Sequence, residues 1–470
     1  MRYLRTILIL VVLLALVDLR AGDRWNVRGM GMARTILAGS RGSEALGINP
    51  ANLAIPDRSS FTLSLIRAGA RVSTELVSYD IYQEYFTGVP GTSADGKREP
   101  KYVTNEDKEK ILNSFPEGVA ATRFDLEAML VGVSVTTGPF GGFGFAMVER
   151  AGALAEIPRD YARFFLYGLD STGSRYNFDG TNVAAWWWRE YNFSYGLRIP
   201  VPSLMFQDLY AGVGFKILHG YGLMETERYS GMLANERAGA NQYQALLEFD
   251  YLARRSGVDF LDEGEDADFS TFPAPAGKGV GFDLGLSARV LPGLLVAASV
   301  TDIGSIHWER NVVETFGQYT ITVDDPFEAA NTDSLERAVK GTNRAGEPFS
   351  TSLPTKLRLG AAIESQEFAP FKLIPGQMLL ALDYTQGLNS SLGNTTKPRI
   401  SAGVEYRPIS FVPLRTGISI GGGDGLRWAA GFGLDFHYFN LDVGTENIAL
   451  LFTPNELEMF SAAAGIRIRF

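Results

Sequence analysis

The sequence predicts an all-β protein: a transmembrane antiparallel β-barrel of about fourteen strands, with a separate N-terminal segment before it and short helices in its long loops. Three observations predict this fold. The N-terminus contains a long apolar run, and no second run of this kind follows in the sequence. Apolar and polar side chains alternate in stretches of about ten residues, and short connections alternate with long ones. Successive side chains of a strand point to opposite faces, so this alternation fits a wall between lipid and a polar lumen.

Composition agrees with this fold class. Hydrophobic residues are 46% of the 470 residues, yet the mean hydropathy is +0.00. A helical membrane protein needs about 20 consecutive apolar residues for each span. The net charge of −10 argues against a nucleic-acid partner, because phosphate contacts need clustered Lys and Arg. The chain has no cysteine, which excludes disulfides, a thiol nucleophile and cysteine-ligated metals.

The N-terminus has the pattern of an export signal. Arg2 and Arg5 precede an apolar run from Ile7 to Val17, and Ala21 offers a small residue for cleavage. The alternative, a single membrane anchor, needs a longer run. We therefore expect a protein of the Gram-negative outer membrane. Its expected parts are a signal peptide over residues 1–21, an N-terminal segment over 22–58 and the barrel over 59–470.

The alternation is clean between Gly281 and Val290, where Phe282 and Leu284 share one face and Asp283 lies on the other. An even number of strands returns both termini to the periplasmic rim, together with the short turns. By this periodicity we place strands near 61–79, 124–137, 143–150, 185–199, 209–221, 280–290, 294–303, 355–364, 377–386, 398–407, 413–421, 426–436, 439–448 and 459–470.

Two of the long loops are expected to contain helices. Asn105 to Phe115 begins with acidic residues and continues with apolar residues at helical spacing, and the run after Pro158, from Tyr161 to Leu169, is similar. Three consecutive tryptophans, Trp186 to Trp188, begin a strand, where we expect them at the membrane interface.

The last strand, Met459 to Phe470, ends the chain on an aromatic residue. Its alternation directs Ile466, Ile468 and Phe470 toward lipid. Such an ending resembles the assembly signal of bacterial outer-membrane barrels. The resemblance implies three partners: the barrel assembly machinery, outer-membrane lipid and lipopolysaccharide.

The lumen-facing positions of the predicted strands carry many charges, so an apolar ligand would need a separate apolar pocket. The charged residues that we expect to line the lumen are Asp283, Arg289, Lys356, Arg358, Glu364, Glu405, Arg407, Arg467 and Arg469.

A stretch from Gly29 to Ala54, rich in Gly, Ala and Ser, runs into the motif Asn49, Pro50 and Ala51. This arrangement resembles the FadL-like outer-membrane transporters of hydrophobic compounds. Weaker likenesses in 301–308, 353–360 and 414–442 extend the resemblance along the chain and include relatives of the secretion-associated protein PorV. The resemblance implies that the N-terminal segment over 22–58 forms a hatch or plug inside a fourteen-stranded barrel. The plainer alternative is a turn that leads into the barrel, because Pro50 fixes its own φ and favours extended geometry at Asn49.

In FadL-like proteins a kinked strand provides a lateral opening. Ala68 and Gly69, inside the first long strand, are candidates for such a kink, since glycine often marks a bulge. An ordinary bend that relieves barrel curvature is the alternative interpretation.

The sequence gives little support for a catalytic function, because His219, His307 and His437 belong to no recognisable catalytic motif. We expect neither an enzyme nor a cofactor. No metal site is expected either, since the acidic residues in 262–268 lack the spacing of a calcium loop. The first functional hypothesis is a channel or uptake protein for small hydrophobic molecules. The second is an adaptor or scaffold barrel, PorV-like and without transport, that engages a secreted protein.

Overall fold

A computed structural model describes the residues 23–76, 79–90, 98–99, 101–169, 173–200, 206–237, 243–258, 273–323, 340–368, 370, 375–436, 438–452 and 459–470. The proposed signal peptide and the acidic residues in 262–268 lie outside them. Within this part of the chain, no helix is long and apolar enough to cross a membrane.

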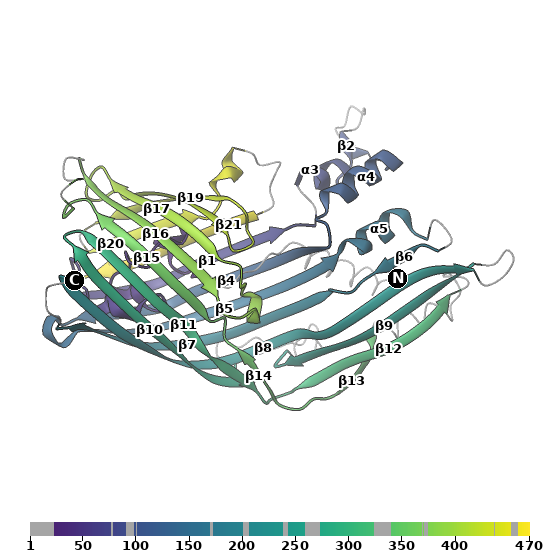
Figure 1. Ribbon diagram of the computed structural model, residues 1–470, viewed down its shortest axis with the longest axis horizontal. Coiled ribbons are helices and arrows are strands. Elements are labelled where there is room, and N and C mark those ends of the chain that lie inside the picture. The colour runs from purple at the N-terminus through teal and green to yellow at the C-terminus, as the bar shows by residue number, and fades with distance from the viewer. Residues whose placement is uncertain are drawn as a thin grey trace.

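Fourteen antiparallel strands form the closed barrel that the sequence predicts (Figure 1). Closure occurs where the last strand pairs with the first, and Phe61 and Phe470 exchange backbone hydrogen bonds of 3.1 and 3.0 Å there. Around the barrel the strands are β1 (Phe61–Thr74), β4 (Val119–Thr136), β5 (Gly142–Pro158), β7 (Asn182–Ile199), β8 (Asp208–Arg237), β10 (Gly277–Leu291), β11 (Leu294–Trp308), β15 (Lys356–Glu364), β16 (Gln377–Gly387), β17 (Arg399–Arg407), β18 (Leu414–Gly421), β19 (Arg427–Asp435), β20 (Phe439–Thr445) and β21 (Met459–Arg469).

Each predicted strand corresponds to one of these fourteen, and side chains alternate between the two faces of the wall as the periodicity indicates. Leu284 is 52% exposed on the outside of the barrel, whereas its neighbour Asp283 is fully buried on the inside. In β21, Ile466 and Phe470 are exposed and Arg467 is buried. The outer surface is therefore an apolar band and the inner surface is charged.

Beyond the barrel, β8 continues for 30 residues in all and carries a sheet that the sequence analysis missed. This extension projects from the end opposite to the C-terminus (Figure 1). Register shifts beside Trp187 and Thr226 interrupt the alternation in this region, which hides it from a period-two search. The additional strands are β6 (Arg175–Asn177), β9 (Tyr243–Ser256), β12 (Val313–Val323), β13 (Thr342–Ala345) and β14 (Phe349–Ser352), with β2 (Val89–Pro90) and β3 (Arg98–Glu99) as a separate pair.

Both predicted loop helices are confirmed as α4 (Asn105–Ser114) and α5 (Arg159–Tyr167). Thr104 and Asp107 form a capping box that fixes the start of α4. The other helical turns are α2 (Val27–Met30), η1 (Gly42–Ala45), η2 (Pro50–Ala54), α3 (Tyr79–Ile81), η3 (Tyr82–Phe86), η4 (Gly138–Phe140), η7 (Ser391–Gly393) and η8 (Ile448–Leu451).

Lipid exposure of the outer face leads to a first prediction. Leu284→Arg, near the middle of β10, should destabilise the barrel in a bilayer by about 2–4 kcal/mol, because it places a charge in hydrocarbon. Leu291→Arg, at the rim end of the same strand, is the matched control and should cost about 0–1 kcal/mol. Urea unfolding in lipid vesicles measures both values. Equal costs would contradict the membrane position inferred for β10.

Candidate functional site: the plug and the lumen

The N-terminal segment fills the barrel on the side of the short turns, where it is seen in purple among the strands (Figure 1). From Asp23 to Ile55 every residue is buried except Arg28 and Arg34, which are partly buried. Its apolar side chains, among them Leu46 and Leu53, pack in one cluster with inward-facing residues of the wall. The segment therefore lies inside the barrel as a folded plug.

The turn at Asn49 rests directly on a row of glycines. Gly142, Gly196, Gly212 and Gly285 are cross-strand partners on four neighbouring strands. A Cβ at Gly212 would collide with the backbone of Pro50 and Ala51, and a Cβ at Gly285 would collide with the side chain of Asn49. Only glycine permits this close approach of two backbones.

Hydrogen bonds fix the same turn. The Asn49 side-chain amide donates to the Leu286 carbonyl at 3.2 Å and to Ser287 Oγ at 2.9 Å, while its oxygen accepts from the Ala51 amide at 3.1 Å. At one end of the glycine row, the Ser299 hydroxyl donates to the Ile48 carbonyl at 2.8 Å. The motif that the sequence singled out is thus the point where the plug joins the wall.

On another part of the wall, two more glycine pairs face the plug. Gly403 pairs with Gly417 and Gly431 with Gly444, and a Cβ at any of these positions would press against backbone or Cβ atoms of plug residues 27–33. The carboxylate of Asp383 accepts hydrogen bonds from the Ile36 and Leu37 amides at 2.7 and 2.9 Å. The plug therefore docks through its backbone at several points.

Buried ion pairs link the plug to the barrel. Glu44, which is fully buried, lies 3.1 Å from Arg467, 3.2 Å from Arg67 and 3.3 Å from Arg28. Arg28 also contacts Glu405 of the wall at 2.7 Å. Removing one member of such a network leaves uncompensated charge in a dry interior, which is costly.

A family model described as a family of unknown function (DUF5723) matches residues 50–446. The chain belongs to this family. A search of curated proteins finds no match.

Solved structures that resemble this DUF5723 member include the toluene transporter TbuX of Ralstonia pickettii, with 12% identity and a TM-score of 0.47 over 95% of this chain and 100% of that one. The toluene transporter TodX of Pseudomonas putida has 11% identity and a TM-score of 0.39 over 96% and 97% of the two chains. A Pseudomonas aeruginosa FadL homologue has 12% identity and a TM-score of 0.41 over 96% and 97%. The expected resemblance to FadL-like proteins is thus found among solved structures as well, over nearly the whole chain.

The structure of this DUF5723 chain places all nine predicted lumen residues on the inner face of the wall, and all but one of them within ion-pair distance of a side chain of opposite charge. Asp283 pairs with Lys216, Arg358 with Asp23, Glu364 with Arg41, Glu405 with Arg28, Arg407 and Arg415, Arg467 with Glu44, Arg289 with Asp208 and Glu367, and Arg407 and Arg469 with Asp435. The exception is Lys356, whose ammonium group has no carboxylate within ion-pair distance among the described residues.

Sequence reasoning missed the plug's own charges and a buried cluster around Lys216. The Lys216 ammonium lies 2.5 Å from Asp302, 2.9 Å from Asp283 and 3.3 Å from Glu190. Lys216 alternates with outward-facing Phe215 and Ile217, and this pattern could have revealed it. Asp302 has a positive φ of 58° and breaks the alternation of β11, so no period-two pattern could have found it.

The expectation for the three tryptophans was wrong for two of them. Trp186 and Trp188 are 5% and 2% exposed and belong to an apolar cluster on the inner face, which also contains Trp308, Ile306 and Phe349. Only Trp187 points the other way, and its indole nitrogen donates to Glu149 at 2.9 Å. The inner face of the wall therefore carries a packed aromatic cluster in addition to its charged residues.

Proposed function

We propose that this protein is an outer-membrane channel of a Gram-negative bacterium that takes up small hydrophobic molecules, as its resemblance to FadL-like transporters implies. One observation carries the proposal: the buried aromatic cluster of Trp186, Trp188 and Trp308 inside an otherwise charged barrel. Sites for hydrophobic ligands are mostly apolar and aromatic. The three rings are at most 5% exposed, so a ligand reaches them only when their neighbours move aside. The plug then acts as the hatch.

A kink in β1 supports a lateral exit from the lumen. Ile66 has a positive φ of 45° and is 70% exposed, and the pairing with β21 shifts between Leu65 and Ala68. The wall beside this bulge has a groove on its outer face that is formed mainly by small residues of β1 and β19–β21. A β-bulge weakens local pairing, which favours an opening at this place.

An uptake assay tests the proposal. The full chain and a variant that lacks residues 29–54 are placed in vesicles with a lipopolysaccharide outer leaflet, and entry of an uncharged aromatic dye is followed by fluorescence. We expect slow, saturable entry with the full chain and faster, unsaturable entry with the variant. Absence of dye entry with both proteins would refute the transport function. Heat-modifiable migration in detergent gels confirms that both barrels are closed.

The second candidate is a PorV-like adaptor that engages a secreted partner and does not transport. It is favoured by the many contacts that fasten the plug and by the extension of β8, β9 and β12 beyond the barrel. Shortening the extension by deleting residues 228–252 separates the two functions. If the protein is a channel, dye entry should persist after this deletion. If it is an adaptor, the deletion should abolish co-purification of the secreted partner, and neither the full chain nor the shortened one should admit dye.

For assembly, we propose that β21 is the signal read by the barrel assembly machinery. Ile466 and Phe470 are exposed on its outer face, and the Phe470 ring lies 6.1 Å from that of Phe61 and 5.9 Å from that of Tyr438. Outer-membrane lipid and lipopolysaccharide then surround the apolar band. Nothing in the chemistry of the described site suggests an enzyme or a cofactor, so neither is part of the proposal.

A further inference from the structure

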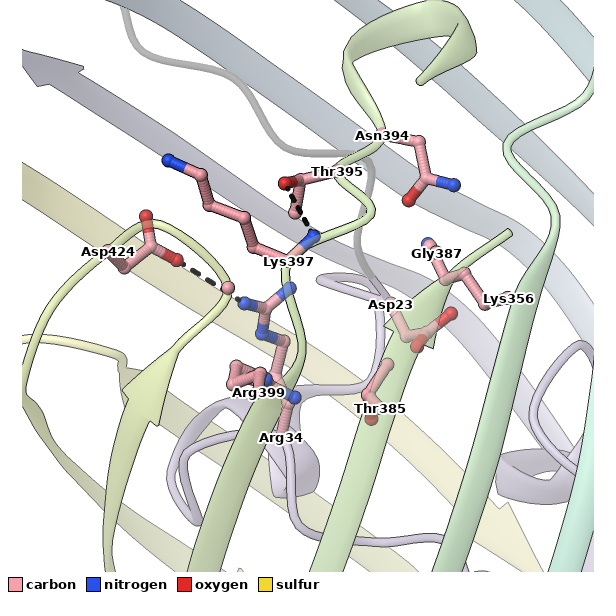
Figure 2. Close-up of a pocket in the computed structure, with 11 residues that line it drawn as sticks. Asp23, Arg34, Lys356, Thr385, Gly387, Asn394, Thr395, Lys397, Arg399 and Asp424 are labelled. Atoms are coloured by element: carbon pink, nitrogen blue, oxygen red, sulfur yellow. Dashed lines mark hydrogen bonds and ion pairs between the residues drawn. The ribbon is translucent and has the colours of Figure 1, made fainter. Parts of the chain in front are cut away.

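A polar cavity lies where the plug meets the long-loop ends of β15–β18 (Figure 2). Its volume is about 40 Å³. None of its lining side chains is aliphatic or aromatic, and most of them carry a charge or a hydroxyl group. The lining residues are Asp23, Arg34, Lys356, Thr385, Gly387, Asn394, Thr395, Lys397, Arg399, Gly422 and Asp424.

Positive charge dominates this cavity. Four of the lining residues are cations and two are carboxylates, and both carboxylates are already engaged. Asp23 lies 2.5 Å from Arg358, which does not line the cavity. Asp424 lies 2.6 Å from Arg71 and 3.8 Å from the lining residue Arg34, which also lies 2.6 Å from Glu446 (Figure 2). Among the described residues, the ion pairs of the lining cations therefore involve Arg34 and neither Lys356 nor Arg399.

Lys356 and Arg399 carry the uncompensated charge. They are 4% and 7% exposed, and within the described ranges neither has a carboxylate within 4.0 Å. The Lys356 ammonium has no hydrogen-bond acceptor among the described residues, and the only acceptor that Arg399 has there is the Ala33 carbonyl at 3.2 Å. Other lumen cations, such as Arg415, contact carboxylates at distances of 2.6–2.7 Å.

Leaving an ammonium and a guanidinium buried without counter-charge is costly, and a bound anion would supply the missing counter-charge. Lys397 at the mouth adds a third cation without an ion pair in the described chain, and the hydroxyls of Thr385 and Thr395 can donate hydrogen bonds. We propose that this cavity is a binding site for a small hydrophilic oxyanion, with a phosphate or carboxylate group held between Lys356 and Arg399. The site is compatible with a channel and with an adaptor alike.

Isothermal titration calorimetry with inorganic phosphate tests the proposal on the detergent-solubilised full chain, with ionic strength held constant by sodium chloride. The wild type should bind phosphate at one site. Lys356→Met and Arg399→Gln should each weaken binding by at least about tenfold, since each removes a charge-assisted hydrogen bond. Arg289→Gln, which removes a paired lumen cation at the other rim, should leave the affinity unchanged.

Folding of the variants is checked by heat-modifiable migration, and phosphate should raise the unfolding temperature of the wild type and of Arg289→Gln but not of Lys356→Met. A second titration uses decanoate, a carboxylate on an apolar chain. Binding of decanoate but not phosphate, with the same dependence on Lys356, would overturn the hydrophilic ligand class. Phosphate binding that is absent in the wild type, or equal in wild type and Lys356→Met, would overturn the site itself.

Discussion

Gly212→Ala should displace the plug from its contact with the barrel wall. The new methyl group would overlap the backbone of Pro50 and Ala51, and neither that turn nor β8 can move aside, because Asn49 is bonded to Leu286 and Ser287 on the next strand. Overpacking of this kind costs about 1–3 kcal/mol where side chains can adjust, and more where backbone meets backbone. We therefore expect a barrel that still closes but holds its plug loosely.

The absence of cysteine allows a clean measurement of this effect. Ala45 is fully buried in the plug, so Ala45→Cys should resist a membrane-impermeant maleimide in the otherwise wild-type chain and react quickly when Gly212→Ala is added. Gly29→Ala is the control, since a Cβ there meets only ordinary contacts at 3.4 Å and should not increase labelling. Equal labelling with and without Gly212→Ala would show that the glycine row does not hold the plug.

Alternation was sufficient to predict the barrel because one physical cause acts along all fourteen strands: lipid on one side and a polar interior on the other. It fails where a bulge changes the parity, as at Asp302, and where a strand leaves the barrel, as in the distal half of β8. It also treats each inward position as equivalent. Asp283→Arg would pass as a mild change on alternation alone, yet Asp283 is fully buried against Lys216, and the substitution would set two cations together.

The Asn49, Pro50 and Ala51 motif could be found in the sequence, but its receptor could not. Gly142, Gly196, Gly212 and Gly285 are spread over the strands from β5 to β10 and become neighbours only through strand register. The same holds for the tryptophans, because Trp186 and Trp188 of β7 face inward to meet Trp308, which ends β11. The plug's binding surface and the aromatic cluster are formed by residues of different strands. Which of these residues meet depends on strand register, and no short-range pattern in a single sequence predicts it.

Glu44→Gln should produce the largest loss of stability. Glu44 is the only carboxylate shared by Arg28, Arg67 and Arg467 among the described residues. Within that part of the chain, its neutral replacement leaves Arg67 and Arg467 without an ion pair in the dry interior, while Arg28 keeps its contact with Glu405. Breaking a buried network in this way costs about 3–5 kcal/mol. The urea midpoint of unfolding in lipid vesicles should fall accordingly, and in the Ala45→Cys background the plug should become accessible to the maleimide probe.

Glu364→Gln is the matched control, since it removes a carboxylate that also pairs with a plug arginine, Arg41, but is 33% exposed. Solvent screens that pair, so its loss should cost about 0–1 kcal/mol. Adding Arg467→Leu to Glu44→Gln should recover part of the lost stability, because one of the two cations left without a carboxylate is then gone. If the second change only destabilised further, repulsion among the guanidinium groups could not be the cause, and Glu44 would act through packing instead of charge.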